Sequence, residues 1–286
     1  MRRLAIGRRH KCDVILVRCT RRDDFAVAAA QLSLHRKHTV ILCATANNCQ
    51  EYRVDYIFAV PARSSIAIAG HDAQFPVNRI YCIGRNYAEH AREMGMPVER
   101  DVPMFFCKPA DAIVAQAADG ADIAVAYPSV THDLHHEVEM VVALASGGKD
   151  ISVDQALQHV FGYAIGLDLT RRDLQAAAKA KGWPWDVAKA FDHSAPISTI
   201  QPVSVIGHPT RVELSLEVNG APRQRGDIAD MLFSVAEIIH ELSKLFELKA
   251  GDLIFTGTPA GVAALKRGDR FHAALGGIAE LRGTIV

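Results

Sequence analysis

The sequence lacks an apolar run of 18 residues, a Walker loop and a G-x-G-x-x-G motif. The first absence argues against a transmembrane helix, and the other two leave a phosphate or nucleotide site without support. Charge of one sign is not in excess, because 32 Lys and Arg balance 32 Asp and Glu, so neither a nucleic acid nor a membrane is expected as a partner. There is also no linker rich in Pro, Gly and Ser. With 49% apolar residues among 286, the chain can form one large domain or a domain with an appendage.

Cysteine is scarce in most of the chain, since only Cys82 and Cys107 lie beyond residue 53. Two cysteines do not make a disulfide framework, so a cytoplasmic location is expected. Residues 1–53 differ, with four cysteines and with 11 Lys and Arg against 4 Asp and Glu. Such a segment could be a targeting peptide, a small zinc module or a leader outside the folded domain. We favour the leader, because the segment has no apolar h-region and no C-x-x-C pair. The prediction is a basic N-terminal extension over 1–53 that is not part of the catalytic fold, and a folded domain over 54–286.

Hydrophobic periodicity predicts more strands than helices. Compact or alternating apolar runs predict strands at 80–83, 134–144, 161–167, 212–218 and 253–258, and a pair of strands within 270–286. Helical spacing predicts helices at 86–94, 153–160, 171–181 and 230–248. The dipeptide Asn219-Gly220 after a strand-like run predicts a hairpin. Because strands and helices do not alternate regularly, the predicted fold class is α+β with a large share of β.

Two acidic residues lie close together in the strand predicted at 134–144. Side chains on a strand alternate, so His135, Glu137 and Glu139 would share one face. Two carboxylates at this spacing repel one another unless a cation lies between them. The apolar run that follows indicates that the strand enters the core, where a carboxylate needs a partner such as a hard divalent cation. The alternative is an exposed strand face that carries two solvated acids.

Asp168 strengthens the metal interpretation. It follows the buried strand predicted at 161–167 and would lie at the end of that strand, facing a pocket. Three carboxylates suit an octahedral Mg²⁺ or Mn²⁺ site that leaves coordination positions for water and substrate. Taken alone, Asp168 could instead cap the helix that follows.

Other polar residues could take part in catalysis. His90 and Glu93 are three residues apart on the helix predicted at 86–94, whose weakly apolar face suggests poor burial. A carboxylate beside an imidazole can form a general base, although an exposed pair of this kind is usually only surface. Lys189 lies among apolar residues and could extend to water or place a charge beside an anionic substrate. The loop 256–259 could donate hydrogen bonds to a carboxylate, or simply end a strand.

In order and spacing these residues resemble the fumarylacetoacetate hydrolase family over 54–286. The motifs that carry the resemblance are Gly84-Arg85-Asn86-Tyr87, His90-x-x-Glu93, His136-Glu137-x-Glu139, Leu167-Asp168, Arg172-Asp173, Lys189, and Gly251-Asp252 followed by Thr256-Gly257-Thr258-Pro259-x-Gly261. Within the family, residues 134–137, Trp185 and residues 191–196 are most similar to the fumarylpyruvate and acylpyruvate hydrolases. The resemblance implies a β-rich mixed fold with a short mobile lid helix, a homodimer, and Mg²⁺ or Mn²⁺ as the cofactor.

The resemblance also implies roles for individual residues. The implied metal ligands are Glu137, Glu139 and Asp168. The implied catalytic residues are His90 and Glu93, as a dyad on the lid helix, and Lys189. The residues implied to bind the pyruvyl end of the substrate are Arg172, Gln175, Lys189 and Thr258.

The activity implied by the resemblance is hydrolysis of a carbon–carbon bond in a 2,4-dioxo acid. The expected substrate is fumarylpyruvate, cleaved to fumarate and pyruvate, as in gentisate-type breakdown of aromatic compounds. Four alternatives stay open: hydrolysis of another acylpyruvate, decarboxylation of oxaloacetate through the same metal-stabilised enolate, isomerisation of an unsaturated dioate, and binding without turnover.

Overall fold

The computed structural model describes residues 15–18, 40–45, 48–52, 57–93, 95, 98, 100 and 102–286. The chain divides into two compact units, Met1–Ala62 and Arg63–Val286. In the first unit, β1 (Ile15–Arg18) pairs in parallel with β2 (Val40–Thr45), and β2 pairs antiparallel with β3 (Asn48–Tyr52). The extension predicted over 1–53 falls within this unit. Most of it lies outside the described residues, so its interpretation as leader, targeting peptide or zinc module stays open.

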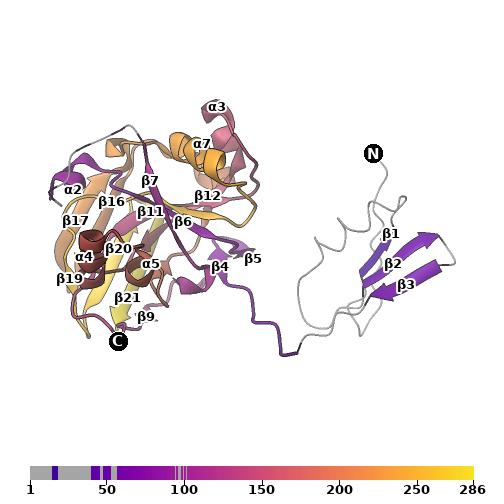
Figure 1. Ribbon diagram of the computed structural model, residues 1–286, viewed down its shortest axis with the longest axis horizontal. Coiled ribbons are helices and arrows are strands. Elements are labelled where there is room, and N and C mark those ends of the chain that lie inside the picture. Colours follow the sequence, from indigo (N-terminus) through magenta and orange to yellow (C-terminus); the bar gives the residue numbers. More distant parts are fainter. Residues whose placement is uncertain are drawn as a thin grey trace. The chain divides into compact units, whose positions relative to one another are not determined.

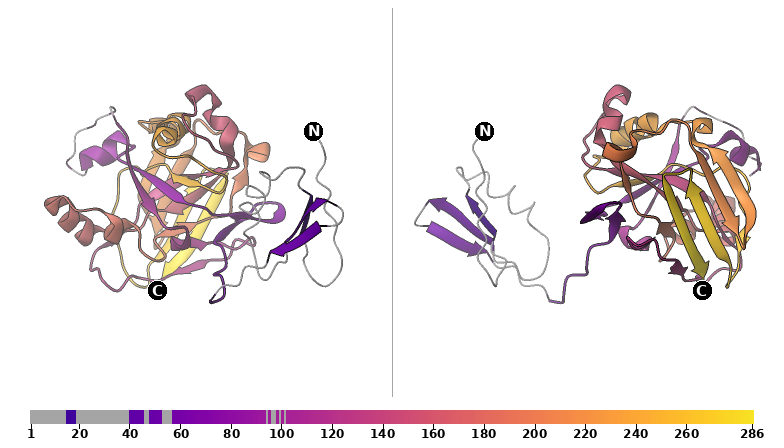
Figure 2. Two further views of the ribbon diagram at one scale, coloured as in Figure 1. Left: turned by 45° about the vertical axis from the view of Figure 1, so that its right-hand side comes forward. Right: turned by 180° about the vertical axis from the view of Figure 1, so that it is seen from behind.

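The second unit is a strand-rich α+β fold (Figures 1 and 2), as the sequence predicts. Its strands are β4 (Ser65–Ile68), β5 (His71–Pro76), β6 (Ile80–Gly84), β7 (Met104–Lys108), β8 (Ile113–Ala115), β9 (Ile123–Val125), β10 (Leu134–His135), β11 (Val138–Leu144), β12 (Val160–Leu167), β13 (Thr170–Arg171), β14 (Ala195–Ile197), β15 (Gln201–Pro202), β16 (Glu213–Val218), β17 (Ala221–Asp227), β18 (Leu253–Phe255), β19 (Ala264–Leu265), β20 (Arg270–Leu275) and β21 (Ala279–Ile285). Its α-helices are α2 (Ala88–Glu93), α3 (Val153–Ala156), α4 (Arg172–Lys181), α5 (Asp186–Lys189), α6 (Val203–Ile206) and α7 (Val235–Leu245). Its 3₁₀ turns are η1 (Ala110–Ala112), η2 (Leu157–His159) and η3 (Ile228–Asp230).

An eight-stranded sheet carries the central strands of this unit. Its order is β7-β6-β18-β11-β12-β14-β8, with β15 paired to β12. Every residue of β11 is buried, so both faces of the sheet are covered there. Met140 and Val142 face the main apolar core, whereas Val141 and Ala143 face a second apolar cluster on the other side. Because side chains alternate along a strand, Glu139 lies on the side of the second cluster.

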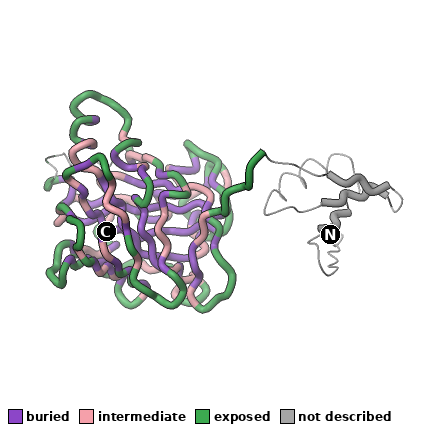
Figure 3. The backbone as a smooth tube through the Cα atoms, turned by 90° about the horizontal axis from the view of Figure 1, so that it is seen from below, coloured by how far each residue is buried: buried purple, intermediate pink, exposed green. Residues whose placement is uncertain are grey.

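The main apolar core lies between this sheet and a five-stranded sheet of order β17-β16-β20-β21-β9. Helix α7 adds its buried face, including Ile238 and Leu242, to the same core. Figure 3 shows that buried segments of the chain lie inside this unit and exposed segments lie around them. Among the helices of the described residues, none has both the length and the apolar character required to cross a bilayer.

Two turn and cap signals explain where elements end. Asn219 and Gly220 have φ of 54° and 75° and join antiparallel β16 and β17, which confirms the predicted hairpin. The helix predicted at 230–248 is longer than α7. The helix begins only after Ser234, which forms a capping box with Glu237.

The continuous strand predicted at 134–144 is wrong, because the chain leaves strand pairing at His136 and Glu137. β10 belongs to a small sheet with β13 and β19, whereas β11 enters the eight-stranded sheet. Between them, His136 N donates to Ala263 O over 3.2 Å and Val138 N donates to the side chain of Gln224 over 3.0 Å. These partners replace the strand hydrogen bonds at the point where the chain passes from one sheet to the other.

Candidate active site

Three carboxylates meet where β11 and β12 lie side by side. Glu139 on β11 is paired with Gly166 on β12, and Asp168 follows the last residue of β12. Glu137 precedes β11, and its carbonyl oxygen accepts a hydrogen bond from Asp168 N over 2.8 Å. Gly166 is required by close packing, since a Cβ there would lie 2.8 Å from the ring of Phe255. The pairing of two neighbouring strands therefore brings the acids together.

All three carboxylates are buried, and their exposed fractions are 6% for Glu137, 2% for Glu139 and 1% for Asp168. Each offers an oxygen within 4.8 Å of the others. Burial, and then the charges of Asp168 and Glu137, raise the pKa of Glu139 well above its ordinary value. Among the described residues, Glu139 forms no ion pair, whereas Asp168 and Glu137 do. Buried, crowded oxygen donors of this kind fit a hard divalent cation such as Mg²⁺ or Mn²⁺.

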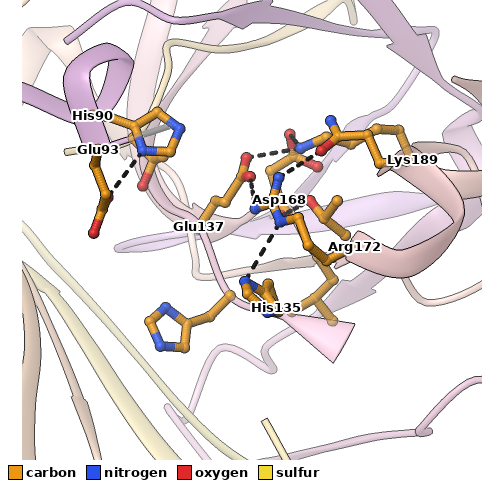
Figure 4. Close-up of polar contacts among 12 residues, drawn as sticks. His90, Glu93, His135, Glu137, Asp168, Arg172 and Lys189 are labelled. Carbon is orange, nitrogen blue, oxygen red and sulfur yellow. Dashed lines mark hydrogen bonds and ion pairs between the residues drawn. The ribbon is translucent and has the colours of Figure 1, made fainter. Parts of the chain in front are cut away.

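Two cations hold this cluster on one side (Figure 4). Lys189 Nζ lies 2.7 Å from both Glu137 Oε2 and Asp168 Oδ2. Arg172 donates from Nη2 to Glu137 Oε1 over 2.5 Å and from Nη1 to Gln175 Oε1 over 2.6 Å. Burial raises the pKa of Glu137, but the charges of Lys189 and Arg172 together lower it by more, so the pKa lies below its ordinary value. Burial lowers the pKa of Lys189, yet Asp168 and Glu137 raise it above its ordinary value. Glu137 and Lys189 are therefore both ionised at neutral pH.

Lys108 is a third cation at the site and was not among the residues predicted from the sequence. It ends β7 and is only 2% exposed. Its Nζ lies 2.8 Å from Asp168 Oδ1 and also donates to the carbonyl oxygen of Lys189. The available signal was a lysine that ends an apolar run directly before Pro109, but such a lysine more often extends to water.

His90 and Glu93 form the expected pair on α2 (Figure 4). His90 Nδ1 lies 3.4 Å from Glu93 Oε2, and both carboxylate oxygens of Glu93 accept from Gly261 N at 3.1 Å. The expectation of poor burial is wrong for His90, which is 7% exposed. Burial lowers the pKa of His90, although Glu137 and Glu93 act to raise it. The imidazole is therefore neutral and can accept a proton at Nε2.

Thr258 lies on the loop after β18, where Gln224 on β17 holds it. Like Lys108, Gln224 was not among the predicted residues. Gln224 Nε2 donates to Thr258 Oγ1 and to Pro259 O, both over 2.8 Å, and its Oε1 accepts from Val138 N. The Thr258 hydroxyl itself donates to Val138 O over 2.8 Å. In the same loop, Gly257 N donates to Glu139 Oε2. One buried amide thus connects the loop to the segment between the two glutamates.

Most of these groups line one cavity, whose volume is about 460 Å³ when its open mouth is included. The predicted residues that line it are His90, Glu137, Glu139, Asp168, Arg172, Gln175, Lys189 and Thr258. Glu93 lies outside the wall and contacts His90 instead. His135, expected on the face of the two glutamates, contacts Asp133 and Arg172 and is not part of the wall.

Comparisons with known proteins identify the family of the chain that carries this cavity. The profile described as fumarylacetoacetate (FAA) hydrolase C-terminal matches residues 79–286. The human protein named oxaloacetate tautomerase FAHD1, mitochondrial, is 41% identical over 202 residues, which is 71% of this chain and 89% of that protein.

Solved structures give the same result. The crystal structure of fumarylpyruvate hydrolase from Pseudomonas aeruginosa, in complex with Mn²⁺ and pyruvate, is 52% identical with a TM-score of 0.79, and the match covers 81% of this chain and 99% of that chain. The 2-hydroxyhepta-2,4-diene-1,7-dioate isomerase from Mycobacterium marinum is 32% identical with a TM-score of 0.62, over 73% of this chain and 75% of that chain. The chain therefore belongs to the fumarylacetoacetate hydrolase family of hydrolases and isomerases.

Proposed function

We propose that the chain hydrolyses the C3–C4 bond of a 2,4-dioxo acid, with fumarylpyruvate as substrate and fumarate and pyruvate as products. The observation that carries the proposal is that a buried cluster of three carboxylates and a neutral histidine with a carboxylate partner belong to one cavity. The solved fumarylpyruvate hydrolase at 52% identity supports the choice of substrate.

Glu137, Glu139 and Asp168 would hold the metal, Mg²⁺ or Mn²⁺. Their burial and mutual proximity fit such an ion, because burial and the charges of Asp168 and Glu137 disfavour the ionised form of Glu139 unless a cation is bound. When bound, the ion would supply positive charge to the 2-oxo acid end of the substrate and to the enolate that develops there.

His90 would act as the general base. Because its Nδ1 faces Glu93, the N–H belongs on Nδ1 and the lone pair on Nε2. Nε2 would take a proton from a water molecule while the water oxygen attacks C4. The C3–C4 bond then breaks, and its electron pair stays on the pyruvate fragment as an enolate. Protonation of C3 gives pyruvate, and the water oxygen leaves in the new carboxyl group of fumarate.

The remaining predicted residues would bind the pyruvyl end. Lys189 is buried and ionised, so it is a fixed positive charge that can stabilise the enolate without rearrangement. Arg172, with Gln175 as its partner, can donate to the substrate carboxylate. The Thr258 hydroxyl would do so by redirecting the proton that it donates to Val138 O in this structure. The homodimer implied by the resemblance and the cytoplasmic location expected from the scarcity of cysteine stay predictions.

Oxaloacetate tautomerisation is a second candidate, because relatives near 40% identity bear that name. This reaction removes a proton from the hydroxyl on C2 of the enol and adds one to C3, and it needs no attacking water. An assay of the purified chain with Mg²⁺ on fumarylpyruvate, acetylpyruvate and enol-oxaloacetate in parallel tests the choice. We expect fumarylpyruvate to give fumarate and pyruvate. Loss of the enol-oxaloacetate signal or release of carbon dioxide, with both dioxo acids untouched, would replace hydrolysis with tautomerisation or decarboxylation.

A further inference from the structure

The wall of the cavity carries more positive than negative side chains. Its cations are Arg85, Arg172, Lys179 and Lys189, and its carboxylates are Glu137, Glu139 and Asp168. The formal sum is 4 − 3 = +1 with His90 neutral, and a divalent ion would raise it to +3. A substrate with one carboxylate leaves +2, and one with two carboxylates leaves +1. Charge balance therefore favours the substrate with two carboxylates.

The four cations differ in their protein partners. Arg172 and Lys189 each form ion pairs with the acid cluster. Arg85 and Lys179 form no ion pair with any carboxylate in the described part of the chain. Lys179 Nζ lies 5.1 Å from the ring centroid of Trp185, which also lines the cavity. Burial, and then the like charges of Arg172 and Arg85, lower the pKa of Lys179. Glu137 acts in the opposite direction, but no carboxylate among the described residues forms an ion pair with Lys179.

Arg85 is held in a backbone conformation that L-residues rarely adopt, with φ of 61°. The side chain of the next residue, Asn86, holds the backbone at this point in place. The side-chain amide of Asn86 donates to Phe233 O and Thr256 O, and its oxygen accepts from Phe233 N over 2.7 Å. Strain held by such an anchor is common at functional sites. Its effect here is to keep an arginine at the cavity wall.

We propose that Arg85 and Lys179 bind a second carboxylate of the substrate, at the end away from the acid cluster, and so select 2-oxo dicarboxylates over 2-oxo monocarboxylates. The inference rests on the proposed function, because it assumes that Arg172, Gln175 and Thr258 bind the pyruvyl end of the substrate. A guanidinium and an ammonium group are the usual partners of a carboxylate, and both would remain hydrated when an uncharged acyl group is bound.

Binding of two uncleavable acids of equal chain length tests this selection without turnover. 2-Oxoheptanedioate and 2-oxoheptanoate differ only in a terminal carboxylate or methyl group. Calorimetric titration of the full chain loaded with Mn²⁺ should show the dicarboxylate binding about 10-fold or more tightly, as expected for hydrogen bonds to a charged group. The double variant Arg85→Gln, Lys179→Met should abolish the difference. Lys181→Met is the matched control, because Lys181 is exposed, contacts Trp183 and lies outside the cavity wall.

Three results would overturn the inference: equal affinities for the two acids in the wild type, a preference that survives in the double variant, or a preference that Lys181→Met removes as well. Failure of the proposed function is recognised separately. If the dicarboxylate preference is present and depends on Arg85 and Lys179 while no dioxo acid is cleaved, the selection stands and the hydrolase assignment falls. If fumarylpyruvate and acetylpyruvate are cleaved with equal kcat/KM and the two uncleavable acids bind equally, the hydrolase assignment stands and the selection of dicarboxylates falls.

Discussion

Gln224 donates to the Thr258 hydroxyl over 2.8 Å, and the same side chain accepts from Val138 N between the two glutamates of the acid cluster. The amide is 2% exposed, so it has no water to replace these partners. A residue of β17 that would not touch the substrate therefore holds both the loop that carries Thr258 and the chain that carries Glu137 and Glu139.

Replacement of Gln224 by Leu should lower the free energy of unfolding by about 2 kcal/mol, because buried donors and acceptors lose their partners. It should also raise KM more than it lowers kcat, since Thr258 is proposed to bind the substrate in its ground state. Chemical denaturation and steady-state kinetics measure the two effects. Gln201→Leu on β15 is the control, because its side chain forms no hydrogen bond with the described residues. An unchanged KM in Gln224→Leu would show that the amide does not position Thr258.

Replacement of Glu139 by Gln separates metal binding from stability. In the metal-free protein, it replaces one of three crowded buried carboxylates by a neutral amide, so the variant should unfold at an equal or higher temperature than the wild type. Mn²⁺ should raise the Tm of the wild type, by linkage of binding to folding, but not that of the variant. Differential scanning calorimetry with and without Mn²⁺ measures both. A variant that keeps the full Mn²⁺ shift would exclude Glu139 as a ligand.

Replacement of His90 by Gln should lower kcat by about 100-fold or more, the usual contribution of a general base, with little change in KM. His71→Gln is the control, because His71 is exposed on β5. Retention of most activity in His90→Gln would favour decarboxylation, which needs no attacking water.

The pH dependence of kcat/KM tests the same residue. The base form of His90 is required, so activity should fall as pH falls through the pKa of His90, which burial keeps below 6.5. Glu93 acts to raise that pKa, so Glu93→Gln should move the acidic limb to still lower pH while it lowers kcat. A limb that lies above 6.5, or that moves upward in Glu93→Gln, would contradict the role of His90 as the base.

Local sequence patterns predicted the fold class. Together with the family resemblance they also indicated residues that line the cavity, but they did not predict how the chain runs between those residues. Asp168 could be placed because a buried strand, β12, leads directly to it. The break at His136 and Glu137 could not be predicted, because its hydrogen-bond partners, Ala263 and Gln224, are distant in sequence. Glu137 and Glu139 still meet Asp168, but through the pairing of β11 with β12 and not through one continuous strand.

Lys108 and Gln224 show why the rest of the site was missed. Each is an ordinary residue in its local sequence, and each acquires its role only when β7 and β17 are placed beside the acid cluster and the loop of Thr258. The burial of His90 is a similar case. Its helix has little apolar character of its own, and contacts from elsewhere in the chain cover it.

The most direct test of the proposed hydrolysis is the stoichiometry of fumarylpyruvate consumption by the purified full chain, measured before and after metal removal with EDTA. We expect each molecule consumed to yield one fumarate and one pyruvate, EDTA to abolish the reaction, and added Mg²⁺ or Mn²⁺ to restore it. Consumption that continues in the presence of EDTA, or that yields carbon dioxide or an isomer in place of the two acids, would contradict it.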